Sequence, residues 1–318
     1  MMGTFFWVGG LNPISSQALS AIAEGEIAES TLTYYVFPSP RGISWNSPRA
    51  LTWSALWNML PTRHEVEHSI GHVNVEMDCR NPDSGGMGVV AGRSVAIAGR
   101  SVVTAGMTTA ATDNSRQMIL SDGYGLGVLL LSLPGRLEFG ADLAPQLPKR
   151  FETGDISVIK FRISDETCQR LLDYRSEYES RGYSANYGLP NRPRYGEGAG
   201  CSAFGTSFLE VAGLLTEEHF REWTRTIRFP EWTIGGPITG RKVSIAKLLF
   251  SFSSRWANKD EPHQEVFFWD PDLMHEWIVR NFDSNREGFT YFSDGNAKGM
   301  TIDARDVATP NEPFWKHE

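Results

Sequence analysis

Residues 72–77, His-Val-Asn-Val-Glu-Met, alternate strictly between polar and apolar side chains. Successive side chains of a β-strand point to opposite faces of the sheet, so this stretch predicts a strand with one apolar and one polar face. The apolar residues would face the core. The polar face begins with His72 and continues with Asn74 and Glu76, and it is where we expect chemistry.

Segments with strand or helix patterns lie on both sides of this stretch. Residues 31–37 are rich in β-branched and aromatic side chains and end at a Pro-Ser-Pro breaker, which predicts a strand. Ser164 stands where a helix N-cap belongs, and Gly182 stands where that helix would end. We also predict a helix over residues 50–60, short strands over 101–104 and 125–133, a strand over 156–163, a helix over 164–181 and a helix over 272–281.

The composition excludes several classes of function. The chain has 318 residues and a formal net charge of −8, and its Lys and Arg residues are not clustered, so nucleic acid is not an expected partner. No run reaches the roughly 18 to 20 apolar residues of a transmembrane segment. The first basic residue is Arg41, so the opening segment lacks the positive region of a signal peptide. We expect a soluble protein whose compartment stays open, with a secreted or periplasmic location in a bacterium as one alternative.

The chain has three cysteines, Cys79, Cys168 and Cys201, at wide spacing. An odd number at such spacing argues against a disulfide framework and leaves at least one free thiol. Cys168 falls on the apolar side of the predicted 164–181 helix, so we expect it in the core. No CxxC pair is present, so a structural zinc site is not expected.

Cys201 has the setting of a catalytic thiol. The residues that follow it, Phe204, Phe208 and Val211 among them, recur at helical spacing, so Cys201 would lie in the first turn of a buried helix. The positive end of a helix dipole lowers the pKa of a thiol, and the first N–H groups of a helix stabilise an oxyanion. The Gly-Ala-Gly run of residues 198–200 has little side-chain bulk and would let a substrate approach closely.

His72 is the best candidate for the base that would accept the Cys201 proton, although the two residues are far apart in the chain. His64, His68 and His72 are spaced by four, which would suit metal ligands on one helix. Gly71 and the alternating stretch after it make that helix improbable, so we expect no metal. Nucleotide-binding glycine loops are also missing, and we expect no cofactor.

Three short motifs resemble the permuted papain-like group of the NlpC-type hydrolase superfamily. They are Ser-Ile-Gly-His-Val-Asn-Val-Glu at residues 69–76, Asn-Arg-Pro-Arg-Tyr at 191–195 and Gly-Cys-Ser-Ala-Phe at 200–204. In that group the strand with the histidine precedes the helix with the cysteine, which is the order found here. The resemblance covers roughly residues 30–216.

The resemblance implies an α+β papain-like fold, with an antiparallel, partly barrel-like sheet packed on the Cys201 helix. It also implies hydrolysis of an amide, thioester or ester through an acyl-enzyme, with Cys201 as the nucleophile and His72 as the general base. Such families usually add a third polar residue on a later strand to orient the imidazole. By order along the chain, Thr104 is our first choice for that residue and Thr108 the second, because Glu76 lies about 13 Å along the strand from His72.

Tyr195, Glu197 and Gly200, just before the nucleophile, are our candidates for substrate contacts. We divide the chain into a catalytic domain, residues 1–228, and an aromatic C-terminal extension or small lobe, residues 229–318. The expected substrate is a bacterial cell-wall peptide, and an antibacterial effector would suit such an activity. The alternatives are an acyltransferase or a lipid amidase on the same fold, or an inactive binding or scaffold protein, and the oligomeric state stays open.

Overall fold

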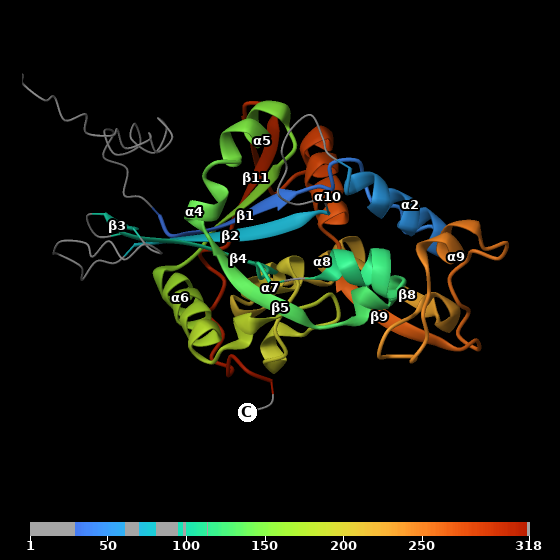
Figure 1. The fold of residues 1–318 in the computed structure, drawn as a ribbon. Helices are drawn as coiled ribbons and strands as arrows, with labels where there is room; N and C mark the ends of the chain where they lie inside the picture. Colours follow the sequence, from blue (N-terminus) through green and yellow to red (C-terminus); the bar gives the residue numbers. More distant parts are fainter. Residues whose placement is uncertain (1–28, 61–69, 81–94, 98–99, 113, 317–318) are drawn as a thin grey trace, which may run out of the picture.

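The computed structural model describes residues 29–60, 70–80, 95–97, 100–112 and 114–316, and its centre is an open sheet (Figure 1). In sheet order the strands are β10 (Thr290–Asp294), β11 (Ala297–Asp303), β6 (Ser157–Arg162), β1 (Thr31–Phe37), β2 (His72–Arg80), β4 (Arg100–Thr109), β5 (Leu133–Phe139) and β7 (Asn186–Tyr187), with β3 (Val95–Ile97) paired to β4. All pairs are antiparallel except β11 with β6. The predicted α+β class is confirmed, but the described strands do not close into a barrel.

Helices cover both faces of this sheet. The large apolar cluster contains the inward residues of β1 and β2, such as Tyr34 and Val75, together with residues of the helices on that face. Those helices are α6 (Asp165–Ser180), α7 (Cys201–Val211) and α10 (Pro271–Ser284). Phe37 points to the opposite face, where it packs with α4 (Gly140–Leu143) and α5 (Leu147–Thr153). The alternation predicted for residues 72–77 is confirmed.

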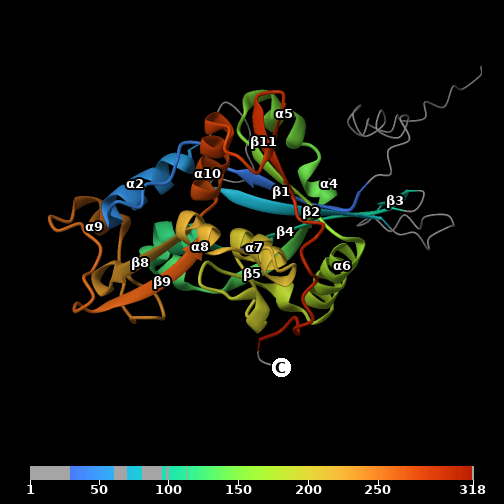
Figure 2. The same cartoon turned by 180° about the vertical axis from the view of Figure 1, so that it is seen from behind.

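A second apolar cluster lies at one end of the sheet, where α2, α9, β8 and β9 gather (Figures 1 and 2). The elements that contribute to it are α2 (Pro48–Asn58), η2 (Leu126–Leu130), β8 (Thr224–Pro230), α9 (Ile245–Phe250) and β9 (His263–Trp269). The helix before β8, α8 (Glu217–Trp223), adds Trp223 to the large cluster instead. The predicted domain boundary at 228/229 falls inside β8, and β10 and β11 belong to the central sheet. The segment after residue 228 is therefore partly built into the main sheet rather than only packed on it.

Local signals set most helix ends, and one predicted strand is wrong. The Ser164 side chain accepts a hydrogen bond from the Thr167 N–H, and Gly182 follows the end of α6 with a φ of 74°. The 125–133 run, by contrast, forms the 3₁₀-helix η2. Gly123 and Gly125 both adopt positive φ just before it and turn the chain, and a continuous apolar run does not by itself distinguish strand from helix.

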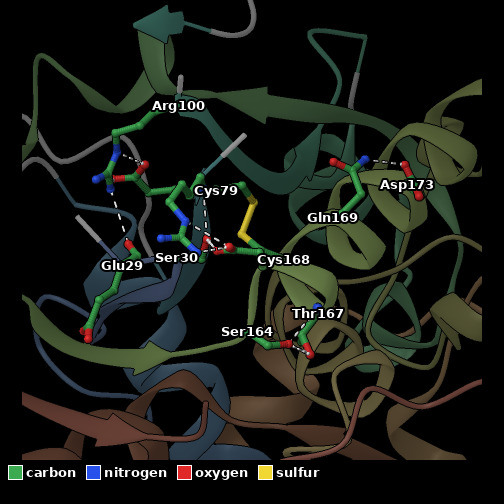
Figure 3. The surroundings of a disulfide bond; sticks show 12 residues. Glu29, Ser30, Cys79, Arg100, Ser164, Thr167, Cys168, Gln169 and Asp173 are labelled. Carbon is green, nitrogen blue, oxygen red and sulfur yellow. Dashed lines mark hydrogen bonds and ion pairs between the residues drawn. A yellow bond between two sulfur atoms is a disulfide. The ribbon is translucent and has the colours of Figure 1, made fainter. Parts of the chain in front are cut away.

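Cys79 at the end of β2 and Cys168 in α6 form a disulfide, with their Cα atoms 5.6 Å apart (Figure 3). Both residues are buried, as predicted for Cys168. The wide spacing argued against a disulfide framework, and the structure has this one bond, with Cys201 as the free thiol. Two segments separated by 89 residues meet because β2 and α6 pack together. Polar contacts surround the bond, including one from Ser30 Oγ to Asp165 and one from Arg100 Nε to Asp78 (Figure 3).

The disulfide should contribute to stability chiefly by restricting the unfolded chain. A closed loop of this length implies about 4 to 5 kcal/mol in the chain-entropy description. We expect a Cys79→Ser/Cys168→Ser variant to lose about 2 to 5 kcal/mol of unfolding free energy in urea. Oxidised and dithiothreitol-reduced wild-type protein should differ by a similar amount, and equal midpoints would contradict this role.

Within the described part of the chain, no helix combines the length and the apolar content needed to cross a lipid bilayer.

Candidate active site

Cys201 is the first residue of α7, and its sulfur lies against the start of β2. Gly200 is the N-cap of this helix, so the predicted position of the cysteine in the first turn is confirmed. The Cys201 Sγ donates to the Gly71 carbonyl oxygen at 3.8 Å and has the Val73 N–H as a hydrogen-bond partner. Cys201 is the free cysteine of the chain, and its exposed fraction is 6%. The sulfur therefore touches the peptide groups on both sides of His72.

The end of one strand pairing explains this contact. β2 pairs with β4 only from Asn74 onward, opposite Gly106, whereas it pairs with β1 from His72. The peptide groups of residues 71–73 on the β4 side are thus within reach of the sulfur. The structure brings Cys201 to the backbone of the segment that carries His72. The His72 ring lies with Phe37 on the face of β2 opposite to Val73 and α7, so contact between the ring and the sulfur stays a prediction.

The His72 ring is held by a carboxylate. Its Nε2 lies 2.7 Å from Glu138 Oε2, and both side chains are almost fully buried. On its other side the ring stacks with Phe37, at 6.0 Å between centroids. A carboxylate only accepts hydrogen bonds, so in the neutral ring Nε2 carries the proton and Nδ1 is the basic nitrogen. Glu138 therefore selects the tautomer that a general base needs.

The electrostatics of the sulfur differ from our expectation. Burial raises the pKa of the Cys201 thiol, and the Glu138 charge acts in the same direction, while hydrogen bonds from Tyr187 and from the Val73 and Ser202 N–H groups partly oppose the rise. We expected the helix start to lower this pKa, and that expectation is wrong because burial, which disfavours the thiolate, is the largest cause of the shift. The resting sulfur is a neutral thiol, and it needs a base to become a nucleophile.

Alkylation should report this raised pKa directly. Since iodoacetamide reacts with the thiolate, we expect the labelling rate of Cys201 to keep rising with pH beyond about 8.5, the pKa of an ordinary cysteine. Without reductant only this thiol is available, because Cys79 and Cys168 are bonded to each other. A labelling rate that levels off well below pH 8 would instead indicate a thiolate–imidazolium pair.

Tyr187 adds a hydroxyl group to the site. It belongs to the two-residue strand β7 at the edge of the sheet, and its hydroxyl is a hydrogen-bond partner of the Cys201 sulfur. Burial raises the pKa of the Tyr187 phenol well above its ordinary value, so it keeps its proton. A neutral phenol beside the sulfur is suited to donate a hydrogen bond to an oxyanion.

Thr104 does not orient the histidine. The β2–β4 register places it opposite Glu76, and its hydroxyl donates to Glu76 Oε2 at 3.3 Å. Glu76 is four residues along the strand from His72, so the first choice for the third residue is wrong. Glu138, on the strand after β4, has that position instead. Our second choice, Thr108, lies opposite Arg136 of β5.

Two of the predicted substrate contacts, Tyr195 and Glu197, lie in a turn where both contact Arg192. Tyr195 has an exposed fraction of 40%, and the Arg192 guanidinium lies over its ring at 4.1 Å. Glu197 accepts from the backbone N–H of the same Arg192 at 2.9 Å. Contact of Tyr195 or Glu197 with a substrate stays a prediction.

The glycine run before Cys201 makes room for the protein's own backbone. Gly198 has a φ of 87°, and a Cβ there would overlap the Asn186 carbonyl. At Gly200 a Cβ would lie 3.2 Å from the Gly188 carbonyl oxygen. The close approach that we expected from a substrate, with Gly200 as its contact, is thus made by residues 186–188, which carry Tyr187 to the sulfur.

Glu138 and Tyr187 are the site residues that the sequence analysis misses. Glu138 stands between Leu137 and Phe139, and a single acidic residue between apolar ones in a strand is a signal of a buried carboxylate. The signal was lost because the strand at 133–139 was not predicted. Tyr187 lies in a short edge strand whose two residues carry no periodic pattern.

Comparisons with known proteins give no family for this chain. No family model, no curated protein and no solved structure matches it. Among the described residues, no group of three metal-ligating side chains is close enough to hold an ion, and His64 and His68 lie outside those residues.

Proposed function

We propose that this protein is a cysteine hydrolase that cleaves an amide, thioester or ester bond through a covalent acyl-enzyme. The observation that carries the proposal is the contact of the Cys201 sulfur with the peptide groups on both sides of His72, whose ring is bonded to a buried Glu138. The free thiol lies against the backbone of the strand that carries the base, and a carboxylate from a third element holds the base; the proposal requires that the ring and the sulfur meet at the start of β2. This arrangement supports nucleophilic catalysis.

The chemistry follows from the protonation states. Nδ1 of His72 would take the thiol proton as the Cys201 sulfur bonds to the substrate carbonyl carbon. The carbonyl oxygen then becomes an oxyanion, for which the first N–H groups of α7 and the Tyr187 hydroxyl are the candidate donors. When the tetrahedral adduct collapses, the leaving group takes the proton from His72. Water, deprotonated by the same imidazole, later releases the acid and restores the thiol.

A bacterial cell-wall peptide remains our substrate proposal, on the permuted papain-like fold that the sequence motifs imply. The buried Cys79–Cys168 disulfide supports a location in an oxidising compartment, since such bonds persist mainly outside the cytosol. The bacterial cell wall lies in that environment. A secreted or periplasmic amidase is the version of the proposal that agrees best with both observations.

Trapping of the acyl-enzyme tests the proposal. We would mix the full chain with p-nitrophenyl acetate and measure the intact mass within seconds. We expect one added acetyl group on Cys201 in the wild type and none in Cys201→Ala. Wild-type protein should also release new amino and carboxyl ends from purified peptidoglycan, and Cys201→Ala should release none. A chain that gains no acetyl group and releases no product would contradict the proposal.

The rival function is a binding or scaffold protein that uses the same fold without turnover. The small exposed fraction of Cys201 and its raised thiol pKa favour that alternative. It predicts binding of peptidoglycan fragments with equal affinity by wild type and Cys201→Ser and no acylation of either. An acyltransferase would acylate Cys201 and pass the group to an added amine, which product analysis with glycinamide reveals.

A further inference from the structure

Glu138 receives a second hydrogen bond at the same oxygen that holds His72. Asn74 Nδ2 donates to Glu138 Oε2 at 2.8 Å, and His72 Nε2 lies 2.7 Å from that atom. Asn74 is fully buried. Two donors on one oxygen restrict the rotation of the carboxylate more than one donor does.

The bond crosses a whole strand. Asn74 of β2 is paired with Gly106 of β4, and Gly106 is paired with Glu138 of β5. Neighbouring strands lie about 4.8 Å apart, so the backbones of β2 and β5 are separated by about 10 Å here. The Asn74 and Glu138 side chains meet above the intervening strand.

Gly106 makes this meeting possible because it has no side chain. A Cβ at Gly106 would overlap the Asn74 amide, with its oxygen nearest and its Nδ2 at 3.1 Å. Gly106 is not at positive φ, so its backbone conformation does not require glycine. Open space above β4 is therefore the structural requirement at this position.

The other end of the Asn74 amide is left without a partner. Among the described residues, Asn74 Oδ1 is a buried oxygen with no hydrogen bond. A buried oxygen without a hydrogen bond lowers the stability of the fold, and such groups are found mainly where the side chain has a function. For Asn74 that function would be the hydrogen bond from its Nδ2 to Glu138.

We propose that Asn74 and Gly106 are positioning residues, which act through Glu138 to hold the His72 imidazole in the orientation required for catalysis. This inference rests on the proposed hydrolase function. Asn74 supplies the second donor to the carboxylate, and Gly106 supplies the space through which that donor reaches.

The test compares Asn74→Ala, Gly106→Ala and the double variant with p-nitrophenyl acetate as the substrate. We expect kcat to fall about tenfold or more in each variant, with KM within about twofold, because both residues are proposed to act through Glu138 rather than on the substrate. In Asn74→Ala the acid limb of the kcat/KM profile should move to higher pH, since the Glu138 charge loses the Asn74 donor and acts more strongly on His72. The double variant should recover the thermal stability lost in Gly106→Ala, because the overlap is gone, but not its kcat.

Thr104→Val is the matched control. Thr104 lies on the same strand and face as Gly106, two residues away, and it contacts Glu76 rather than Glu138. It should leave kcat and the acid limb unchanged.

Three outcomes separate the two proposals. Variants that lose only thermal stability, with wild-type kcat and an unmoved acid limb, would overturn the positioning role while leaving the hydrolase intact, provided that Glu138→Gln is slow. If Thr104→Val lost as much kcat as Asn74→Ala and Gly106→Ala do, the positioning role would be overturned as well. A wild-type chain with no ester turnover would overturn both proposals.

Discussion

Replacing Cys201 by alanine should abolish hydrolysis. The sulfur is the only group at the site that forms a bond to the substrate, so we expect kcat to fall by at least about 10³-fold, and Cys201→Ser to fall nearly as far. The measurement is release of p-nitrophenol and of peptidoglycan fragments by equal amounts of folded protein. Circular dichroism should be unchanged, because alanine is tolerated at the first position of a helix.

The Cys79→Ser/Cys168→Ser variant is the control for that experiment. It leaves Cys201 as the sole cysteine and alters a bond in the core between β2 and α6. At a temperature where it is folded, its kcat should stay within about threefold of wild type. If Cys201→Ala kept most of the activity, the nucleophile assignment would be wrong, whatever the disulfide variant did.

Replacing Glu138 by glutamine should slow the reaction by up to about 10⁴-fold, the loss seen when the carboxylate partner of a catalytic histidine becomes an amide. Glutamine keeps the size of the side chain but can present an N–H group to His72, which favours the wrong tautomer. The loss should appear in kcat, with the fold intact in circular dichroism.

Glu76→Gln provides the matched control for Glu138→Gln. Glu76 lies on the same polar face of β2 and binds Tyr35 and Thr104, and burial raises the pKa of its carboxyl group. We expect its kcat to stay within about twofold of wild type. Equal losses in the two variants would show that the effect comes from altered charge in the sheet rather than from the contact with His72.

Local patterns in the sequence predict the parts of the site that lie within one element. The alternation of residues 72–77 predicts the strand and the faces of its side chains, and the spacing of apolar residues after Cys201 predicts the helix. These patterns arise because side-chain direction repeats every 2 residues in a strand and every 3.6 in a helix. The Ser164 cap and Gly182 are local signals of the same kind.

Partners that come from different elements depend on the order and register of the strands. Glu138 reaches the polar face of β2 because β5 lies next to β4, and Gly106 leaves room above β4 for its bond with Asn74. Thr104 was the wrong choice because the same register places it beside Glu76, four residues along β2 from His72. A register shift of one residue would turn every one of these side chains to the other face.

The sequence by itself therefore determined the α+β class, the strand that carries His72 and the helix that begins at Cys201. Only the tertiary structure decided that Cys79 bonds Cys168, that Glu138 and Tyr187 join the site, and that burial raises the pKa of the thiol. The physical reason is that periodicity is encoded in neighbouring residues. Strand order and burial, in contrast, follow from the packing of the whole chain, which no short stretch contains.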